Sequence, residues 1–300
     1  MSRLEEFAKS RWDEPLPAAA LPAAITALET GKVLYFPKLA FTFAPSEQKF
    51  LTIDGLNLKA KNISFNPNNG TLKNFHCHEM NKNALKQLLQ RYAKYARQLL
   101  AELFPQYTAS LQLGRTSFRP AKIEGRKLSY RKDDTRLHVD AFPATPNQGQ
   151  RILRVFTNVN PNLPRIWRLG EPFPQVVQTF SPHLKAPLYG SAKLLQLLKL
   201  TRGYRTLYDH YMLQLHNAMK ADLAYQKSAN QQEICFPAGS TWVVYTDLVS
   251  HAAMKGEFAL EQTFYLPVHA MQDEYRSPLR VLEKVLSQKL VPVSALSYAS

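Results

Sequence analysis

Two groups of short segments with β-strand character, separated by a helical stretch, constrain the fold of this 300-residue chain most strongly. The segments are rich in β-branched and aromatic residues, as β-strands are. They cover residues 109–118, 135–142, 151–160, 233–236, 241–246 and 257–266. A predominantly helical insertion at about 185–225 separates the first three from the last three. Strands brought together across such a gap favour a jelly-roll or cupin-like barrel.

Helices flank the predicted strands, so the expected fold class is mainly β with flanking helices (α+β). The clearest helix covers 84–104, where apolar residues recur at helical spacing until Pro105 ends it. We expect one domain over 1–300, because a chain of this length can form one large core. Its expected parts are a largely helical support (1–105) with a short strand at 33–36, a β core (106–270) and a closing helix (271–300).

His138 and Asp140 lie two residues apart in the predicted strand 135–142. Side chains alternate between the two faces of a strand, so these two point the same way. His251 follows the predicted strand 241–246 after a short connection, and in a barrel that late strand can lie beside the early one. Two histidines and one carboxylate can bind one face of an iron(II) ion and leave positions open for a cosubstrate and O₂. A His-x-Asp pair is also common without a metal, so a structural role stays open.

A second group of possible metal ligands is the run His76-Cys77-His78-Glu79. Its members lack the spacing of a zinc finger, and we expect a polar loop or strand edge there. His216 lies in a predicted helix at 208–223 and is expected to pack or cap.

An iron site of this kind usually needs a cosubstrate that supplies two electrons. 2-Oxoglutarate does so by chelating the iron, and its distal carboxylate must then pair with a buried Arg or Lys. Arg154 is the best candidate, because apolar residues flank it and a charge in an apolar strand needs a partner. Asn158 shares its strand face and is the second candidate for cosubstrate binding. A salt bridge from Arg154 to a protein carboxylate, or a position on the outside of an edge strand, explains the sequence equally well.

Three longer stretches of the sequence resemble the Kdo 3-hydroxylases, which act on the acidic sugar Kdo of lipopolysaccharide. They are 136–143 (RLHVDAFP), 208–216 (YDHYMLQLH) and 236–247 (FPAGSTWVVYTD), the last of which continues into 249–251 and 256–264. The resemblance implies a double-stranded β-helix fold, with His138, Asp140 and His251 as the ligands of Fe(II). It also implies 2-oxoglutarate and O₂ as cosubstrates and hydroxylation of Kdo at carbon 3, which gives the sugar Ko.

One feature departs from the wider dioxygenase superfamily. Many of its members place the oxoglutarate-binding Arg on the last strand, whereas 257–266 contains no Arg or Lys here. The resemblance therefore leaves this role to Arg154.

The net charge of +15 and the pI near 9.7 suit an acidic substrate, since Kdo carries a carboxylate and is attached to a phosphorylated lipid. Residues 115–136 hold eight basic and three acidic residues next to the metal motif. Arg119 and Arg136 are our candidates for substrate binding, because they lie on or beside predicted strands. Trp167 is a third candidate. Each of these three can also be explained without a ligand, as part of a solvated loop or of the core.

The segment 172–208 contains no acidic residue and combines basic residues with several leucines. Such a segment can lie in an anionic membrane interface, but it can equally be a leucine-rich helix that covers the barrel. We expect a cytoplasmic protein, peripheral on the inner face of the bacterial inner membrane, because no signal peptide or spanning segment is recognisable. No nucleic-acid module is recognisable, so no nucleic acid partner is expected.

The leading hypothesis is a dioxygenase that hydroxylates Kdo linked to lipid A. One alternative is a 2-oxoglutarate oxygenase that acts on protein or nucleic acid. The other is a non-catalytic cupin-like module that binds an acidic lipid or sugar, in which the His and Asp residues are structural.

Overall fold

The computed structural model describes residues 2–52, 62–75, 79–126 and 128–292. The strands are β1 (Leu4–Glu6), β2 (Val33–Phe36), β3 (Ile63–Asn66), β4 (Thr71–Lys73), β5 (Gln112–Arg119), β6 (Arg151–Asn158), β7 (Arg165–Leu169), β8 (Gln232–Phe236), β9 (Thr241–Tyr245), β10 (His251–Lys255) and β11 (Ala259–Leu266). The α-helices are α1 (Leu21–Glu29), α2 (Glu79–Leu103), α3 (Phe173–Phe180), α4 (Ser191–Leu197), α5 (Leu207–Ala221), α6 (Leu223–Ser228) and α7 (Pro278–Leu286).

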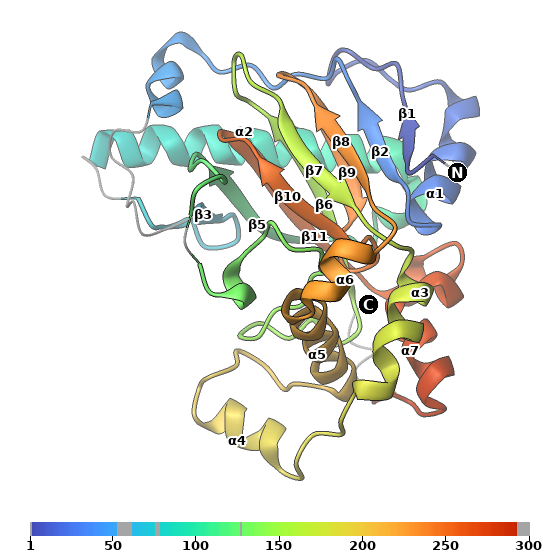
Figure 1. The fold of residues 1–300 in the computed structure, drawn as a ribbon. Helices are drawn as coiled ribbons and strands as arrows, with labels where there is room; N and C mark the ends of the chain where they lie inside the picture. Colours follow the sequence, from blue (N-terminus) through green and yellow to red (C-terminus); the bar gives the residue numbers. More distant parts are fainter. Residues whose placement is uncertain (1, 53–61, 76–78, 127, 293–300) are drawn as a thin grey trace.

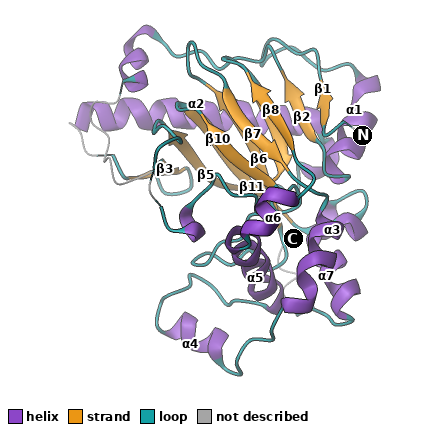
Figure 2. Cartoon of the chain, viewed as in Figure 1, coloured by secondary structure: helices purple, strands orange, loops and turns teal. Residues whose placement is uncertain are grey.

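The strands form a large sheet and a small one (Figures 1 and 2). The large sheet has eight strands in the order β1-β2-β9-β6-β11-β5-β3-β4, and the small sheet has three in the order β10-β7-β8. The pair β1–β2 is parallel, whereas β6 runs antiparallel to both of its neighbours, β9 and β11. Since β6 precedes the helical insertion and β9 and β11 follow it, the large sheet joins the two groups of predicted strands.

An aromatic layer packs the two sheets against each other. The Trp242 ring of β9 stacks on Phe236 of β8 and on Phe156 of β6, with ring centroids 4.1 and 5.3 Å apart. Trp167 of β7 lies edge-on against Phe156, 5.0 Å away, and all four side chains are buried. Aromatic side chains bury large apolar areas, so this layer fixes the small sheet, and with it β7 and β10, over the centre of the large one.

Helices α1 and α2 cover the opposite face of the large sheet, and α2 runs across the back of the strands in Figure 1. The hydroxyl of Tyr92 on α2 donates to the backbone carbonyl of Val155 on β6 at 3.2 Å. The helices α3, α5, α6 and α7 gather at one end of the sheets, and α4 projects beyond them (Figure 1).

Most of the predicted elements match the structure. The predicted strands at 109–118, 151–160, 233–236, 241–246 and 257–266 correspond to β5, β6, β8, β9 and β11, and the predicted helix at 84–104 to α2. The strands β7 and β10 were not predicted, because each has only five residues and includes charged or small ones. The N-terminal support is less helical than expected, since it also contains β1, β3 and β4.

The prediction of a strand at 135–142 is wrong. The structure has a single antiparallel bridge there, between His138 and His251. The backbone N–H of Leu137 donates to the side-chain oxygen of Gln226 at 2.7 Å, and its carbonyl accepts from the same amide at 3.0 Å. A side chain of α6 thus takes the hydrogen bonds that a neighbouring strand would need.

Candidate metal centre

His138, Asp140 and His251 come together at the edge of the small sheet, all three of them buried. One potential ligand atom from each lies within 4.8 Å of the others, and His138 Nε2 is 3.6 Å from Asp140 Oδ1. The bridge between the two histidine backbones sets this geometry, with N–H···O distances of 3.0 and 2.9 Å. Two backbone hydrogen bonds therefore bring the three side chains together, where we had expected two paired strands to do so.

The hydrogen bonds of the two imidazoles leave the same nitrogen of each ring available. His138 donates from Nδ1 to the carbonyl of Arg136 at 2.7 Å, and His251 donates from Nδ1 to the carbonyl of Val249 at 2.8 Å. Backbone acceptors of this kind fix the tautomer and the ring orientation of metal-binding histidines. Burial lowers the pKa of both, for His138 to about 3, so each ring is neutral at pH 7 and Nε2 can bind a metal.

Asp140 is held in its ionised form. Burial by itself raises the pKa of this carboxyl, but the charge of Arg154 is the main opposing effect, and the pKa lies well below its usual range. Arg154 Nη1 lies 3.1 Å from Asp140 Oδ2 and 3.3 Å from Glu261 Oε1. Glu261 in turn pairs with Arg119 at 2.5 Å. The carboxylate is thus the first member of a buried row of alternating charges.

Arg154 lies on β6 in the middle of the large sheet, so the edge-strand interpretation is wrong. Its contacts with Asp140 and Glu261 agree with the alternative that Arg154 forms salt bridges with protein carboxylates. Its Nε is buried without a hydrogen-bond partner, so one donor of the guanidinium stays available to a ligand.

Arg165 is a functional candidate that the sequence interpretation missed. This first residue of β7 is only 3% exposed, yet neither Nε nor Nη1 has a hydrogen-bond partner among the described residues. Burial, and then repulsion from Arg119, lowers its pKa to about 9. A buried guanidinium with free donors is costly unless an anion binds to it. The alternation from Arg165 to Trp167, which puts both side chains on the same strand face, was the available signal.

The remaining candidates divide into two groups. Arg119 and Trp167 line the cavity at the three ligands, and the Trp167 ring stacks on His251 with centroids 5.1 Å apart. Arg136 instead binds the carbonyl of Lys220 at 2.7 Å, outside the cavity lining. Asn158 is also outside the lining, because its amide donates to the carbonyls of Leu163 and Phe236 at 3.0 and 3.1 Å. The structure thus does not bring Arg136 and Asn158 to the cavity, because both side chains have backbone partners outside its lining.

Helix α5 closes the cavity on the side opposite the sheets. His216 on this helix donates from Nδ1 to the carbonyl of Val139 at 2.8 Å and contacts the His138 ring with centroids 5.0 Å apart. This agrees with the packing role expected for it. The run 76–79 cannot be compared, since residues 76–78 and the side chain of Glu79 lie outside the described part.

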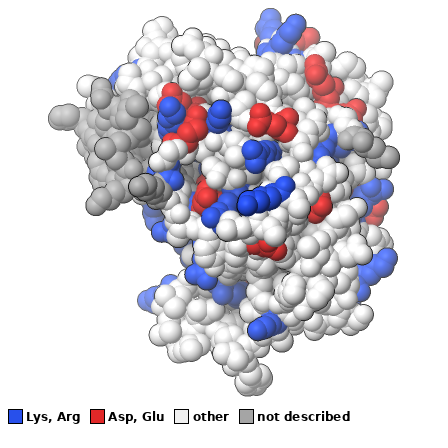
Figure 3. All heavy atoms as spheres, viewed as in Figure 1, with Lys and Arg blue, Asp and Glu red and all other residues white. Residues whose placement is uncertain are grey.

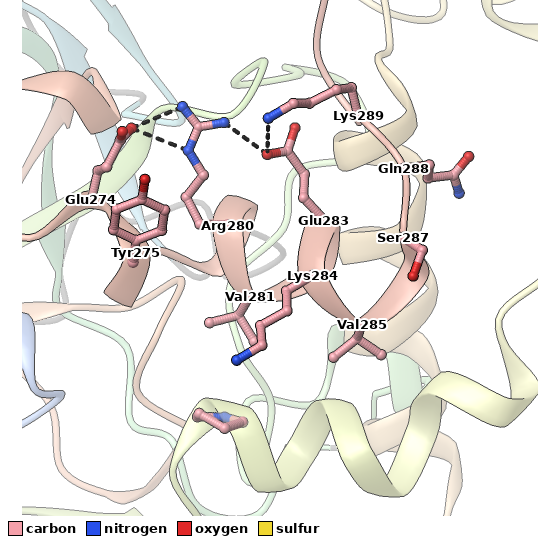
Figure 4. Close-up of a pocket in the computed structure, with 11 residues that line it drawn as sticks. Glu274, Tyr275, Arg280, Val281, Glu283, Lys284, Val285, Ser287, Gln288 and Lys289 are labelled. Carbon is pink, nitrogen blue, oxygen red and sulfur yellow. Dashed lines mark hydrogen bonds and ion pairs between the residues drawn. The ribbon is translucent and has the colours of Figure 1, made fainter.

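The cavity has a volume of about 290 Å³ and is lined by more basic than acidic side chains. A larger hollow of about 980 Å³ lies along α7 (Figure 4). There Arg280 pairs with Glu274 and Glu283 at 2.8 and 2.7 Å, and Glu283 also accepts from Lys289. Four of the charged side chains at α7 are thus paired with one another, whereas the cavity at the three ligands keeps unpaired donors on Arg154, Arg165 and Trp167.

The turn between β9 and His251 is anchored by a second buried ion pair. Asp247 receives two hydrogen bonds from Arg151, at 2.8 and 3.3 Å, and both side chains are fully buried. The preceding carbonyl, that of Thr246, accepts the backbone N–H of Asp140 at 2.8 Å. This turn therefore holds one ligand by its backbone and leads directly into another.

The donor set fits an iron(II) ion. Two neutral imidazoles and one carboxylate on one side leave the opposite positions open, as oxygen-activating iron centres require. The unpaired donors of the cavity lining suit ligands that carry carboxylates.

Comparisons with known proteins agree with this chemistry. A family model described as 3-deoxy-D-manno-oct-2-ulosonic acid (Kdo) hydroxylase matches residues 11–289. A crystal structure of the Kdo hydroxylase KdoO, a non-heme Fe(II) alphaketoglutarate dependent dioxygenase, in complex with alphaketoglutarate and Fe(III), is 48% identical and has a TM-score of 0.93 over 96% of this chain and 97% of that chain. The KdoO complex with cobalt(II) is also 48% identical, with a TM-score of 0.95 over 97% of this chain and 98% of that chain. No match was found among curated proteins.

The family resemblance in the sequence is therefore confirmed along nearly the whole chain. The chain belongs to the Kdo hydroxylase family.

Proposed function

We propose that this chain is an Fe(II)- and 2-oxoglutarate-dependent dioxygenase that hydroxylates carbon 3 of Kdo in the lipid A-linked inner core of lipopolysaccharide, giving Ko. The observation that carries the proposal is the buried set His138, Asp140 and His251, open toward a cavity with unpaired basic donors. We also propose that the two packed sheets are the double-stranded β-helix core expected from the sequence.

The iron would be held by Nε2 of His138, Nε2 of His251 and the carboxylate of Asp140. When bound, the iron and its cosubstrate supply the oxidising chemistry, in which O₂ and 2-oxoglutarate yield succinate, CO₂ and one oxygen atom for the sugar. The residues of the chain bind and orient the reactants and exclude water, and no general base is required. Arg154 keeps Asp140 ionised and available to the metal.

Arg165 is our candidate to pair with the distal carboxylate of 2-oxoglutarate. Arg154 was expected in this role, but its Nη1 is shared between two protein carboxylates, whereas two donors of Arg165 are unpaired. Arg154 can contribute its Nε to the same carboxylate. Arg119 and Trp167, which line the same cavity, are proposed to contact the acidic sugar.

The lipid linkage of the substrate would place the protein at the inner face of the bacterial inner membrane, with peripheral contact to anionic lipid. The described helices include none that is long and apolar enough to cross a bilayer.

Mass spectrometry of the lipopolysaccharide inner core, from cells with and without this protein, tests the proposal. We expect a gain of one oxygen atom on a Kdo unit, dependent on the protein and absent with a folded His138→Ala variant. With purified protein, the same gain should require Fe(II), 2-oxoglutarate and O₂. Succinate formation without oxygen on Kdo would point to another substrate, and the absence of both would point to a non-catalytic module.

A further inference from the structure

The segment 185–205, which contains α4, exposes several large apolar side chains to solvent. Its large side chains Leu188 and Leu197 are 84% and 78% exposed. Five further large apolar side chains of the segment are also exposed: Tyr189, Leu194, Leu198, Leu200 and Tyr204. Leu194, Leu197 and Leu198 share one side of α4, because residues three and four positions apart are neighbours on a helix. Exposed apolar side chains gathered in one segment in this way indicate an interaction site.

The charge around this surface has one sign. Residues 172–208 contain no Asp or Glu. Exposed basic side chains alternate with the leucines: Lys185, Lys193, Lys199 and Arg202. On the face shown in Figure 3, the projecting part that carries α4 shows white and blue spheres and no red ones. Apolar residues rimmed by cations match an anionic lipid surface, whose acyl region takes up the leucines while its headgroups pair with the lysines.

The segment is also attached to the metal centre. The backbone N–H of Arg202 donates to the carbonyl of Ala144 at 3.0 Å, and Arg205 donates to the carbonyl of Pro143 at 2.5 Å. Gln148 donates to the carbonyl of Tyr204 at 3.2 Å. These acceptors and donors belong to the loop that follows Asp140, whose residues Ala141 and Phe142 line the metal cavity.

We propose that the segment 185–205 seats the protein on an anionic lipid surface and thereby places the loop after Asp140 next to the lipid. This inference rests on the proposed function, because a membrane contact helps the reaction only if the sugar to be hydroxylated is attached to a lipid in that surface. The segment binds the membrane, and the tethered loop brings the cavity to the headgroup level, where the Kdo residues lie.

Sedimentation with vesicles tests the proposal directly. The wild-type protein is expected to bind vesicles of phosphatidylethanolamine and phosphatidylglycerol, less at high salt, and to bind phosphatidylcholine vesicles weakly. The triple variant Leu194→Gln, Leu197→Gln, Leu198→Gln should bind the anionic vesicles at least about tenfold more weakly. A matched control replaces two exposed leucines elsewhere, Leu163→Gln and Leu223→Gln, which are 54% and 59% exposed, and should bind like wild type.

Three results would overturn the proposal. They are no vesicle binding by the wild-type protein, equal binding by the triple variant and the wild type, or an equal loss in the control variant. Light scattering tests whether a second copy of the chain binds the leucines instead. A wild-type dimer that becomes a monomer in the triple variant would show this and would contradict the proposal.

A pair of substrates separates this inference from the proposed function. The triple variant should oxidise a water-soluble Kdo oligosaccharide at the wild-type rate but lose activity toward Kdo–lipid A in anionic vesicles. If the substrate proposal is wrong, neither protein oxidises either substrate, while the vesicle binding still decides the inference.

Discussion

Arg151 and Arg154 lie on the same strand, both buried, and yet they have different surroundings. Arg151 faces the helices, is fully buried, makes two hydrogen bonds to Asp247 and lies over the Tyr245 ring at 3.7 Å. Arg154 faces the small sheet and shares one nitrogen between Asp140 and Glu261, while its Nε is unpaired beside the cavity. A buried arginine with saturated partners serves the fold, whereas one with free donors at a cavity is available to ligands.

The largest expected effect is on folding and comes from the saturated pair. Arg151→Met leaves Asp247 buried without a counter-charge, which should lower the free energy of unfolding by about 3–5 kcal/mol. Urea titration measures this, and added Co(II) should not restore the loss, since the pair lies outside the cavity. The double variant Arg151→Met, Asp247→Leu should recover most of the stability. A single variant as stable as wild type would contradict the structural role of the pair.

Arg154→Met should behave differently, because the ion that binds Asp140 can replace the missing charge. We expect the metal-free variant to lose about 2–3 kcal/mol, less than at Arg151 because Arg119 still pairs with Glu261. Co(II) should then raise the thermal midpoint of the variant by more than that of the wild type. Equal shifts in the two proteins would show that Arg154 and the metal act independently, and Arg154→Lys is the control that keeps the charge.

Arg165→Gln should lower the affinity for the cosubstrate without lowering the stability of the fold. Removal of an unpaired buried charge should leave the stability unchanged within about 1 kcal/mol or raise it. The affinity of the Co(II)-loaded protein for 2-oxoglutarate should fall by about 10- to 100-fold, the value of a hydrogen bond to a charged group. Titration followed by the Co(II) absorption spectrum measures the affinity. Unchanged affinity would indicate that Arg154, and not Arg165, pairs with the distal carboxylate of 2-oxoglutarate.

The comparison of the two arginines also shows how far the sequence could lead. The spacing of His138 and Asp140, the position of His251 and the family resemblance were enough to predict three side chains that the structure brings together. The periodicity of apolar residues was enough to find α2 and the long strands. The His-x-Asp spacing and the apolar periodicity are local signals that depend little on distant partners.

What the sequence could not show depends on partners far along the chain. The sequence left open whether Arg154 anchors a cosubstrate or forms a salt bridge, because Asp140 and Glu261 reach it from other segments. Asn158 looked like a ligand-binding amide, but the carbonyls of Leu163 and Phe236 occupy it. Arg165 drew no attention on a short strand whose neighbours β8 and β10 come from the end of the chain. In each case the tertiary partner, and not the residue type, decides the role.

The last expected effect concerns pH and the neutral histidine of the cavity. Burial lowers the pKa of His138 from 6.5 to about 3, so below pH 6.5 the unfolded chain binds a proton that the folded chain does not. The stability contributed by this residue is therefore present at pH 7 and is lost as the pH falls toward the folded-state value. We expect the metal-free protein to lose about 2 kcal/mol between pH 7 and pH 5 from this residue, and the folded His138→Gln variant to lack that part of the decline. Urea titrations of the wild type and of His138→Gln at both pH values measure it. The same decline in His138→Gln would mean that other groups control the acid sensitivity and would contradict the role of His138 in it.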